Sequence, residues 1–592
     1  MIWENSTNEE VLERARAEIR RCCNGELPPI YDPFSGGGSI PLEAQRLGLP
    51  AYGSDLNPVA VTIGKAMIEI PPKFENCDPI HPGAKERNHY RKAEGLAEDI
   101  RHYGQWVREE VRQRIVNLYP QVDLPEEHGG GKATVIAWIW TRTVPSPDPA
   151  YQGTDVPIAS SFALSTSPDK IAWIEPSVDR AAKIITYQIH YDGSPAQIES
   201  AKQGTKKSGA NFECLFSGAA ITPDYIRKAG RSGQIGSKLL AIVAEGTSGR
   251  IYLPPSPSHE AIALEAKATW RPNSIFEPNA LGFRVGNYGH VNWGDFFTER
   301  QLLALNVFKD TIKEARKHIQ TDLKNTPKGG RAQTYADALT LYLCFVLSKC
   351  CDYWSSNCSW HSSKQLIRNT FGGQKLPMVW DYAEANPFSS STGNWNSMLD
   401  WVAKVVAAVP AHGDASCTQA EAQTVAYRPG AVISTDPPYF DYIGYADLSD
   451  FFYCWLRPNL NEIYPELFAT LATPKAHELV ATPCRHGGTN KANAFFLEGM
   501  TRAVSNMADS VSSDYPTTIY YAFKESEIKK EGLSSSGWAT FLEAVLVSGF
   551  SVVGTWPVRT EMANRLRGIG SNALATSVVV VCRKRKMAAE AG

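Results

Sequence analysis

The sequence predicts an α/β protein whose doubly wound sheet is divided between the two ends of the chain. Near the N-terminus a strand, a glycine turn, a helix and a second strand follow one another within about thirty residues, which is how a parallel sheet of this kind opens. The same alternation of strands and helices resumes near residue 394. The sequence between the two parts differs in character. We therefore expect an insertion of about 300 residues with structure of its own.

The composition favours a soluble, intracellular protein. The 592 residues are roughly three to four times a typical domain, so more than one compact core is expected. A hydrophobic content of 43%, a charged content of 21% and a net charge of −2 exclude disordered and fibrous classes. No signal peptide opens the chain, and the longest apolar stretch, 338–348, is too short to cross a bilayer. A cytoplasmic location without a membrane partner is therefore predicted.

The twelve cysteines predict neither a disulfide framework nor a metal site. They contain no CxxC pair, and disulfide frameworks are typical of short secreted chains. Cys350, Cys351, Cys358 and His361 lie close together in the sequence. However, residues 337–352 have the pattern of a helix that buries apolar side chains, where free cysteine is common. We expect no metal.

Hydrophobic patterning divides the chain into four segments. Residues 1–75 and 394–592 carry the α/β alternation. Residues 76–295 contain apolar runs separated by Pro, Gly and Ser clusters, which predicts a β-rich module. Residues 296–393 show apolar residues at helical spacing and are predicted to be mainly helical.

Each expected element rests on one of these patterns. Helices are assigned where apolar residues recur every three or four positions, and strands where short apolar runs end at turn residues. In the inserted module the expected strands lie within 133–144, 170–176, 183–191 and 238–245. The other expected helices are 8–21, 40–47, 297–320, 331–355 and one beginning near 395, and the other expected strands are 29–31, one ending at residue 55, 409–412, 431–435, 517–523, 550–556 and 575–582.

The glycine turn after the first strand is typical of a loop that binds a nucleoside. It reads Asp32-Pro33-Phe34-Ser35-Gly36-Gly37-Gly38 and leads into a helix, whose first N–H groups are free. Asp55 ends the next strand, where a carboxylate can hold ribose hydroxyls, and Asn57 follows it. The spacing differs from GxGxxG and no phosphate-binding GK[ST] follows, so a nucleoside without phosphates is favoured. The alternative is a plain structural turn.

A second turn carries the predicted chemistry. A short apolar strand leads into Asp436-Pro437-Pro438-Tyr439. Two consecutive prolines cannot continue a central strand, because they lack N–H donors and fix φ. Asp436 and the Pro437 carbonyl can accept hydrogen bonds from an exocyclic amino group, and Tyr439 offers a flat platform for a base. The alternative is a structural turn with an incidental tyrosine.

Together the two motifs resemble those of S-adenosylmethionine-dependent amino-methyltransferases of DNA. The stretches DPFSGGGSIPLEAQRLGL, WDYAEANPF, RHGG and GSNALATSVVVVCR further resemble the large prokaryotic adenine-specific DNA methylases that carry an inserted zinc ribbon. This resemblance implies a Rossmann-like seven-stranded methyltransferase sheet, S-adenosylmethionine as cofactor and DNA as partner. It also implies that Asp414 reads the cofactor adenine. Restriction or phage defence, with other subunits of a defence system as partners, is the implied setting.

The sequence departs from this family in two places. The positions that match the ribbon's four cysteines are Ser146, Tyr151, Cys214 and Ser217. Zinc needs three or four N/S ligands, so we expect a degenerate ribbon without zinc, with target recognition as its candidate role. Relatives also have a region before the stretch that begins at Trp3. If that region covers the cofactor or binds DNA, the chain is expected to be a fragment, a split subunit or a weakened enzyme.

The resemblance implies methyl transfer to N6 of an adenine that is flipped out of the helix. An amino group on a base is a poor nucleophile, because its lone pair is delocalised into the ring. Acceptors at Asp436 and the Pro437 carbonyl draw its hydrogens toward tetrahedral geometry and stabilise the developing positive charge. Tyr439 would stack on the flipped base and offset the cost of unstacking it.

Two basic groups are candidate phosphate contacts. One lies between the third and fourth expected strands of the inserted module, and the other lies between the last two strands of the chain. Such charge runs are usually only solvated faces, so that alternative stays open. The candidates are Arg227, Lys228 and Arg231 in the first group and Arg559, Arg565 and Arg567 in the second.

Three alternatives to a DNA adenine methyltransferase stay open at this point. The same turn suits cytosine N4 in DNA, since pocket shape rather than the motif selects the base. It also suits an unpaired adenine in RNA, although no RNA-binding module is evident. A non-catalytic methyltransferase-fold subunit of a defence complex is the third. The intact turn and glycine loop argue against it, and the short N-terminal region argues for it.

Overall fold

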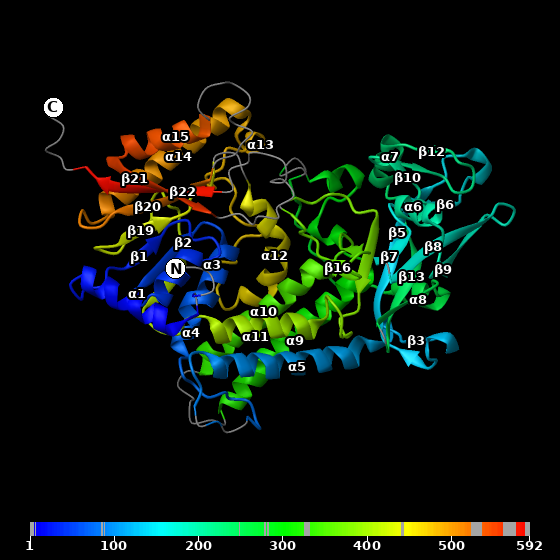
Figure 1. The fold of residues 1–592 in the computed structure, drawn as a ribbon, viewed down its shortest axis with the longest axis horizontal. Helices are drawn as coiled ribbons and strands as arrows, with labels where there is room; N and C mark the ends of the chain where they lie inside the picture. The colour runs from blue at the N-terminus through cyan, green and yellow to red at the C-terminus, as the bar shows by residue number, and fades with distance from the viewer. Residues whose placement is uncertain are drawn as a thin grey trace. The chain divides into compact units, whose positions relative to one another are not determined.

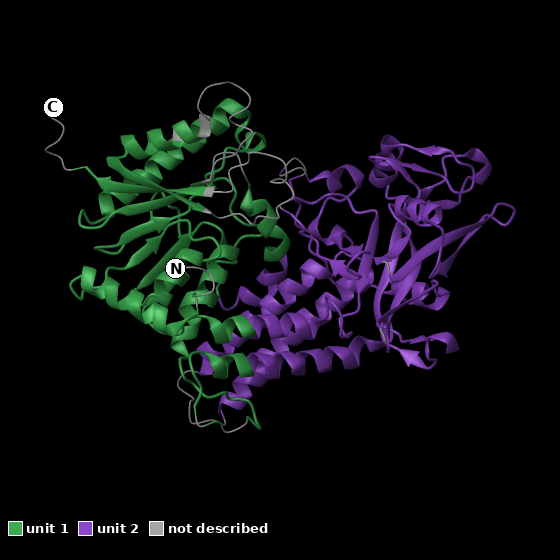
Figure 2. Ribbon diagram, in the orientation of Figure 1, with its two compact units in different colours: residues 1–98, 404–453, 464–592 green, residues 99–403, 454–463 purple. Residues whose placement is uncertain are grey.

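The computed structural model divides into two compact units (Figure 2). Unit 1 comprises residues 1–98, 404–453 and 464–592, and unit 2 comprises residues 99–403 and 454–463. Among the described residues, no helix combines the length and the apolar character needed to span a membrane. The structure describes residues 5, 7–84, 87, 89–167, 169–247, 249–277, 280, 283–324, 332–373, 375–439, 443–522, 536–559 and 576–585.

Unit 1 is built on a seven-stranded mixed sheet (Figure 1). Its strands are β1 (Ile30–Asp32), β2 (Ala51–Asp55), β18 (Ala415–Gln419), β19 (Val432–Thr435), β20 (Thr517–Ala522), β21 (Phe550–Arg559) and β22 (Thr576–Lys584). The order across the sheet is β18-β2-β1-β19-β20-β22-β21. All neighbours up to β20 pair in parallel, whereas β22 is antiparallel to both β20 and β21. The α/β class predicted from the sequence is therefore confirmed.

Helices pack on this sheet through two apolar clusters. The larger cluster joins α14 (Thr489–Ser510) and α15 (Ser536–Val547), which lie side by side in Figure 1, to buried residues of β19, β20 and β22. The smaller one joins α1 (Glu9–Cys22) and α2 (Ser39–Arg46) to β1 and β2. Each fully buried large apolar side chain contributes about 1.5–3 kcal/mol relative to exposure. Unit 1 also contains α3 (Pro58–Gly64), a π-helix (Lys65–Glu69), α4 (Ile70–Lys73), α13 (Pro483–His486) and the first part of α12 (Tyr445–Leu460).

One strand of this sheet lies outside its predicted position. The strand expected at 409–412 is wrong, because this stretch ends a helix: the Val409 N–H donates to the Val405 carbonyl, and Pro410 then stops α11 (Trp395–Ala408). The third parallel strand is β18, which pairs with β2 from Ala415 to Gln419. Its sequence, ASCTQ, has little apolar signal. The other strands predicted for unit 1 are confirmed to within a few residues.

Unit 2 is organised around a five-stranded antiparallel sheet. Its strands are β5 (Val135–Pro145), β6 (Asp155–Pro157), β13 (Gly236–Gly246), β14 (Gly249–Leu253) and β17 (Asp381–Ala385). The order is β14-β13-β5-β17, with β6 also paired to β5. Since β17 comes from the segment 296–393 and β5 from the segment 76–295, these two segments share one sheet.

Smaller sheets and long helices complete unit 2. A three-stranded sheet contains β7 (Ala163–Ser167), β8 (Lys170–Asp179) and β9 (Ile184–His190), so all four strands expected in the insertion are confirmed. The other small strands are β3 (Val122–Asp123), β4 (Lys132–Ala133), β10 (Lys206–Ser208), β11 (Asn211–Glu213), β12 (Ala220–Ile221), β15 (Ser359–His361) and β16 (Leu366–Arg368). The helices are α5 (Glu94–Ile115), α6 (Pro195–Gln203), α7 (Pro223–Arg231), α8 (Pro257–Glu265), α9 (Glu299–Lys324) and α10 (Ala332–Tyr353).

A fully buried ion pair connects α9 to β17 in unit 2. Arg300 donates from Nε and Nη2 to the two carboxylate oxygens of Glu384, at 3.0 and 2.9 Å, and both side chains are at most 1% exposed. Nη1 of Arg300 donates to the Leu118 carbonyl, and the guanidinium lies 4.1 Å from the ring centroid of Trp138. The pair therefore has the bidentate geometry and the additional partners that a buried charge requires.

The four positions that match the ribbon cysteines converge on Cys214. The Ser146 hydroxyl lies 3.5 Å from its Sγ, and Ser217 also hydrogen-bonds to this thiol. Tyr151 packs against the cluster that contains Cys214, and its ring stacks on Phe216 at a centroid distance of 4.9 Å. Hydrogen bonds and aromatic packing hold this part of the insertion together. Across the described residues, no three His, Cys, Asp or Glu side chains gather as a metal site.

Candidate active site

The candidate active site is a cavity of about 520 Å³ in unit 1. It lies at the carboxyl ends of the parallel strands β1, β2, β18 and β19, and it is lined by residues that follow each of them. From β1 the chain adds β2 and then β18 on one side of the sheet, whereas β19 and β20 are added on the other side, so the order of the strands reverses between β1 and β19. A ligand is expected at such a switch point in an open α/β sheet.

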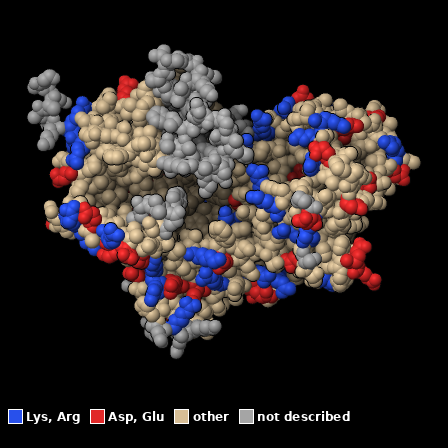
Figure 3. Space-filling view, viewed as in Figure 1, with Lys and Arg blue, Asp and Glu red and all other residues tan. Residues whose placement is uncertain are grey.

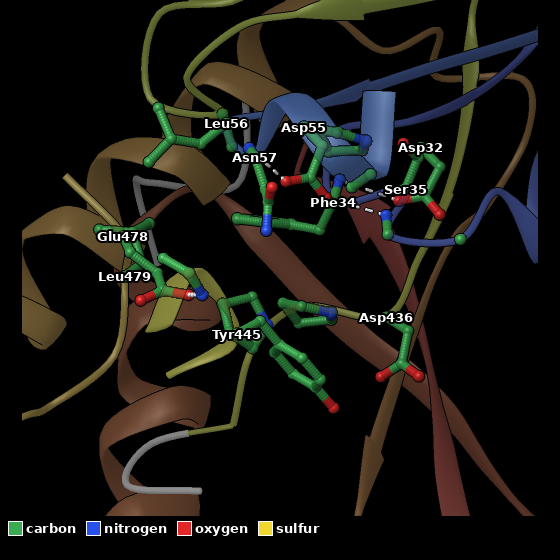
Figure 4. A pocket seen from close by; sticks show the side chains of 18 of the residues that line it. Asp32, Phe34, Ser35, Asp55, Leu56, Asn57, Asp436, Tyr445, Glu478 and Leu479 are labelled. Atoms are coloured by element: carbon green, nitrogen blue, oxygen red, sulfur yellow. Dashed lines mark hydrogen bonds between the residues drawn. The ribbon is translucent and has the colours of Figure 1, made fainter. Parts of the chain in front are cut away.

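Two groups of side chains face each other across the cavity (Figure 4). One group comes from the glycine loop and the end of β2, and the other follows β19 and precedes α13. The predicted loop and the predicted catalytic turn, which are about 400 residues apart in the sequence, therefore line the same space. In Figure 4 the first group includes Asp32, Ser35, Asp55 and Asn57, and the second includes Asp436, Tyr445 and Glu478.

Asp32 joins the ends of β1 and β19. Its Oδ1 accepts a 2.6 Å hydrogen bond from the Thr435 hydroxyl and a 3.0 Å bond from the Phe34 N–H. The side chain is 1% exposed, and this burial raises the pKa of Asp32 to about 7. The two hydrogen bonds oppose the increase, whereas the charges of Asp436 and Asp55 add to it. The carboxyl group thus fixes the loop and gains a proton readily.

The glycine loop turns through two left-handed residues before α2. Gly36 has φ of +49°, and Gly38, which precedes the first residue of α2, has φ of +78°. Residues with side chains rarely adopt these angles, so the loop needs glycine at both positions. Gly53 on β2 lets the loop pack closely, since a Cβ there would lie 2.9 Å from the Ser35 Cβ. Ser35, Gly36, Pro33 and Phe34 all line the cavity.

Asp55 is held by backbone N–H groups on both of its oxygens. Gly36 donates to Oδ2 at 2.9 Å, and Asn57 donates to Oδ1 at 2.8 Å. Burial raises the pKa of Asp55, and these backbone bonds oppose the increase. Each carboxylate oxygen can accept a second hydrogen bond, so Asp55 is oriented for a hydroxyl donor in the cavity.

Asn57 acts as the N-cap of α3. Its Oδ1 accepts a 3.0 Å hydrogen bond from the Val59 N–H, as expected for asparagine at the start of a helix. Its Nδ2 donates to the Ser449 hydroxyl at 2.6 Å. Both residues line the cavity, so Asn57 connects the wall formed after β2 to the wall formed by α12.

The predicted catalytic turn exposes Asp436 at the cavity, whereas Pro437 is buried and Pro438 and Tyr439 are half-buried. The Tyr439 hydroxyl donates to Asp436 Oδ1 at 2.9 Å, and its ring lies 5.2 Å from that of Tyr521. The Asp436 side chain is exposed, yet the atoms packed around it raise its pKa to about 6, against the bond from Tyr439. Pro437 and Pro438 also line the cavity. All four predicted catalytic residues therefore stand at the same site as the glycine loop.

Asp414 lies away from this cavity. It precedes β18, whose first residue pairs with the first residue of β2, so it sits at the amino end of the sheet. It accepts a hydrogen bond from the Tyr52 hydroxyl and lies 3.7 Å from Arg428. The residue that follows β18 into the cavity is instead Glu421, whose Oε1 is 2.6 Å from His477 Nδ1.

The cavity wall formed by 473–486 is secured by ion pairs. Arg485 bonds to Glu478 Oε2 at 2.5 Å and also to Asp447. The other oxygen of Glu478 accepts the Ala446 N–H at 2.9 Å. Burial raises the pKa of Glu478, while Arg485 lowers it. The RHGG stretch that contains Arg485 thus positions Glu478 and the start of α12 at the cavity.

The charged side chains that line the cavity are mainly acidic. Its described lining contains five carboxylic acids and one histidine, and neither Lys nor Arg. Apolar side chains such as Ile40, Leu56 and Leu479 form much of the remaining wall. This chemistry suits a nucleoside that carries a positive charge and hydroxyl or amino donors. It does not suit a phosphate, which needs cationic partners or additional N–H donors.

The basic residues predicted to contact phosphate are placed only in part. Arg227, Lys228 and Arg231 lie on α7 in unit 2 and line neither of the two cavities described for this protein. Arg227 is paired with Asp224 at 2.7 Å, and the other two are exposed. The side chain of Arg559, at the end of β21, and residues 565 and 567 lie outside the described residues.

Asp32→Asn should stabilise unit 1 at neutral and alkaline pH. Because the folded-state pKa lies above the unfolded value, burial of the charge reduces stability as pH rises from about 4 to 7. Asparagine keeps the acceptor oxygen without the charge. We expect the free energy of unfolding to increase by about 2–4 kcal/mol at pH 8 and to change little at pH 4.

Chemical denaturation of both proteins between pH 4 and 8 measures this difference. The exposed Asp509→Asn on α14 is the matched control, measured over the same pH range. An Asp32→Asn difference that stayed constant over the same range would show that Asp32 keeps its charge in the folded state.

Comparison with protein-family models, with curated proteins and with solved structures gave no match for this chain.

Proposed function

We propose that this protein transfers a methyl group from S-adenosylmethionine to N6 of an adenine in DNA. The observation that carries the proposal is the meeting of the glycine loop with the turn Asp436–Tyr439 in one cavity lined by carboxylates. The strand order of unit 1 supports a Rossmann-like methyltransferase sheet, since its first five strands follow the order of nucleotide-binding sheets. The antiparallel β22 between β20 and β21 distinguishes the sheet from a wholly parallel one.

The residues present fit S-adenosylmethionine. Its sulfonium and amino groups are cationic, and the acidic lining of the cavity, with Asp55 at the loop, supplies negative charge. Asp55 lines the cavity, where its carboxylate can accept hydrogen bonds from ribose hydroxyls in addition to those from the backbone. We assign Glu421 to the exocyclic amino group of the cofactor adenine, in the role first expected for Asp414, since it follows β18 into the cavity.

The cofactor supplies the electrophilic methyl group. Asp436 and the Pro437 carbonyl accept hydrogen bonds from the target amino group and localise its lone pair on nitrogen. These acceptors are held by a rigid diproline turn, so they need no reorganisation as positive charge develops on the nitrogen. Asp436 must be ionised for this role. Tyr439 holds its Oδ1 in place through a 2.9 Å hydrogen bond.

The base reaches this turn only outside a stacked helix. Tyr439 and Tyr445 both line the cavity, and Tyr445 is 50% exposed, so an aromatic surface is available to an unstacked base. Stacking on such a ring is worth about 1–3 kcal/mol, comparable to the cost of extruding one base. DNA is the proposed partner, and a cytoplasmic role in marking host DNA is the proposed setting.

Transfer from radiolabelled S-adenosylmethionine tests the proposal. The purified chain is incubated with duplex DNA, single-stranded DNA and RNA, and each product is digested to nucleosides. Label in N6-methyladenine from DNA is the expected result. Label in N4-methylcytosine would keep the mechanism and replace the substrate. Equilibrium dialysis that detects no binding of the cofactor would overturn the proposal altogether.

A further inference from the structure

Unit 2 contains a second cavity, of about 910 Å³, whose lining is cationic. Its charged residues are Lys170, Arg250, Lys349, Lys364 and one carboxylate, Glu245. The four cations come from β8, β14, α10 and the turn that precedes β16. Figure 3 shows Lys and Arg side chains gathered over the region of β16. We call this site the basic cavity.

Arg250 in the basic cavity is held by contacts with neutral side chains. Its Nη2 donates to the Ser391 hydroxyl at 3.2 Å, and its guanidinium lies 5.9 Å from the ring centroid of Trp360. Its Nε is buried and has no hydrogen-bond acceptor among the described atoms. Glu245 is paired with Arg250 across β13 and β14, but its Oε1 accepts hydrogen bonds from Ser390, so the guanidinium can bind an anion in the cavity.

The carboxylate in the basic cavity is engaged by the backbone. Glu245 Oε1 accepts hydrogen bonds from the Ser390 N–H and hydroxyl, at 2.9 and 2.7 Å. Residues 390–393, with the sequence Ser-Ser-Thr-Gly, therefore form a rim of small polar residues before α11. Lys349 and Lys364 are exposed, and the Lys349 ammonium lies 5.7 Å from the ring of Tyr353. The basic cavity thus has net positive charge and hydroxyl donors.

An exposed aromatic ring borders the same site. Trp401 lines the basic cavity and is 68% exposed, which is unusual for the largest apolar side chain. It follows Ser397 by four residues on α11, so both face the cavity from one side of the helix. A flat ring beside several cations and hydroxyls provides the two features that bind a nucleic acid strand without reading its sequence: phosphate contacts and base stacking.

We infer that the basic cavity binds the phosphate backbone of a DNA strand, with a base of that strand stacked on Trp401. The cations come from four elements around a space larger than the catalytic cavity, which suits several phosphates of one strand better than a single small anion. The inference deepens the proposed function, because it assigns the target nucleic acid a binding site outside the catalytic cavity. It depends on that function for the choice of DNA.

Charge reversal at the two exposed lysines tests the inference. We expect Lys349→Glu with Lys364→Glu to weaken the binding of a fluorescein-labelled 20-nucleotide DNA by about 10- to 100-fold at low salt, and to reduce the slope of log Kd against log [salt] by about 2. Trp401→Ala should weaken binding by about 5- to 100-fold without a change in slope. The matched control is Lys132→Glu with Lys202→Glu, two exposed lysines of unit 2 outside the cavity, and it should retain nearly all the affinity.

The outcomes separate this inference from the proposed function. Fluorescence anisotropy measures DNA binding, and equilibrium dialysis measures binding of S-adenosylmethionine. If the variants bind DNA as the native chain does while the cofactor still binds, the inference is wrong and the proposed function is unaffected. If the cofactor does not bind but the variants lose DNA affinity, the basic cavity is a DNA-binding site and the proposed function is wrong. Displacement of the DNA by inorganic triphosphate at equal concentration would show that the cavity takes a small phosphate ligand and would overturn the inference.

Discussion

Asp436→Ala should abolish measurable methyl transfer and leave the affinity for S-adenosylmethionine nearly unchanged. The carboxylate stands at the mouth of the catalytic cavity on a diproline turn, and alanine removes an acceptor for the target amino group without touching the glycine loop. Loss of one placed electrostatic or proton-accepting group costs about 10²–10⁴ in rate. Single-turnover transfer to DNA and equilibrium dialysis of the cofactor measure the two quantities on the same preparation.

The pH dependence adds a test that a structural role for Asp436 would not pass. Because the atoms packed around its carboxyl group raise its pKa to about 6, the ionised and active form should increase as pH rises through 6 and reach a plateau near pH 7. Asp436→Asn keeps one acceptor oxygen and no charge, so its residual rate should not follow this curve. A native rate that is flat between pH 5 and 7 would contradict the assignment of Asp436 as the ionised acceptor.

Arg300→Met should produce the largest loss of stability. It leaves Glu384, which is 1% exposed, as a buried carboxylate without its cation. Removing one partner of a buried ion pair costs about 3–5 kcal/mol. Desolvation of the guanidinium lowers the pKa of Arg300, but the charge of Glu384 raises it by more, so the pKa of Arg300 lies above its ordinary value. Urea unfolding of the full chain, followed by tryptophan fluorescence, should show the transition of unit 2 at a lower concentration.

Two further variants identify the cause of that loss. Arg300→Met with Glu384→Gln removes both charges, and it should recover part of the stability, since no unpaired charge is left. Arg114→Met breaks an exposed pair with Glu314 in the same unit and should cost about 0–1 kcal/mol. A double variant as unstable as Arg300→Met alone would assign the effect to lost packing against Trp138 instead.

The sequence was most informative where glycine, proline and a carboxylate follow a strand. The loop at Asp32 and the turn at Asp436 were both identified from such local chemistry, and the structure brings them to one cavity although about 400 residues separate them. The parallel strands before them explain why: the carboxyl ends of β1 and β19 are adjacent. Local signals thus predicted the meeting of distant residues once the sheet was recognised.

Other parts of the site carried weaker signals. The polar strand β18 was placed several residues early, so Asp414 was expected after the strand, whereas it precedes β18 and Glu421 lines the cavity. His477 and Glu478 belong to a segment without regular secondary structure, and hydrogen bonds with Glu421, Arg485 and the Ala446 N–H hold them at the cavity. The neighbouring RHGG stretch was the one available hint.

The WDYAEANPF stretch shows a different limit. Its residues form β17 and place Asp381 and Glu384 in buried contacts of unit 2: Asp381 accepts hydrogen bonds from the Thr141 hydroxyl and the Ser160 N–H. Acidic residues in a sequence suggest a surface or a site. These two residues instead form hydrogen bonds and an ion pair inside unit 2. Their partners on β5 and α9 are far away in the sequence and could be recognised only in three dimensions.

The interrupted sheet of unit 1 has a consequence for synthesis on the ribosome. The first central pairing, Ile30 with Val432, must wait for about 400 further residues, which takes roughly 20–80 s at common elongation rates. During this interval β1 has an unpaired edge, which is a template for association with other chains. The segment 99–403 of unit 2 emerges first and can fold meanwhile. Slow translation across 404–435 would therefore prolong the time during which the nascent chain depends on chaperones.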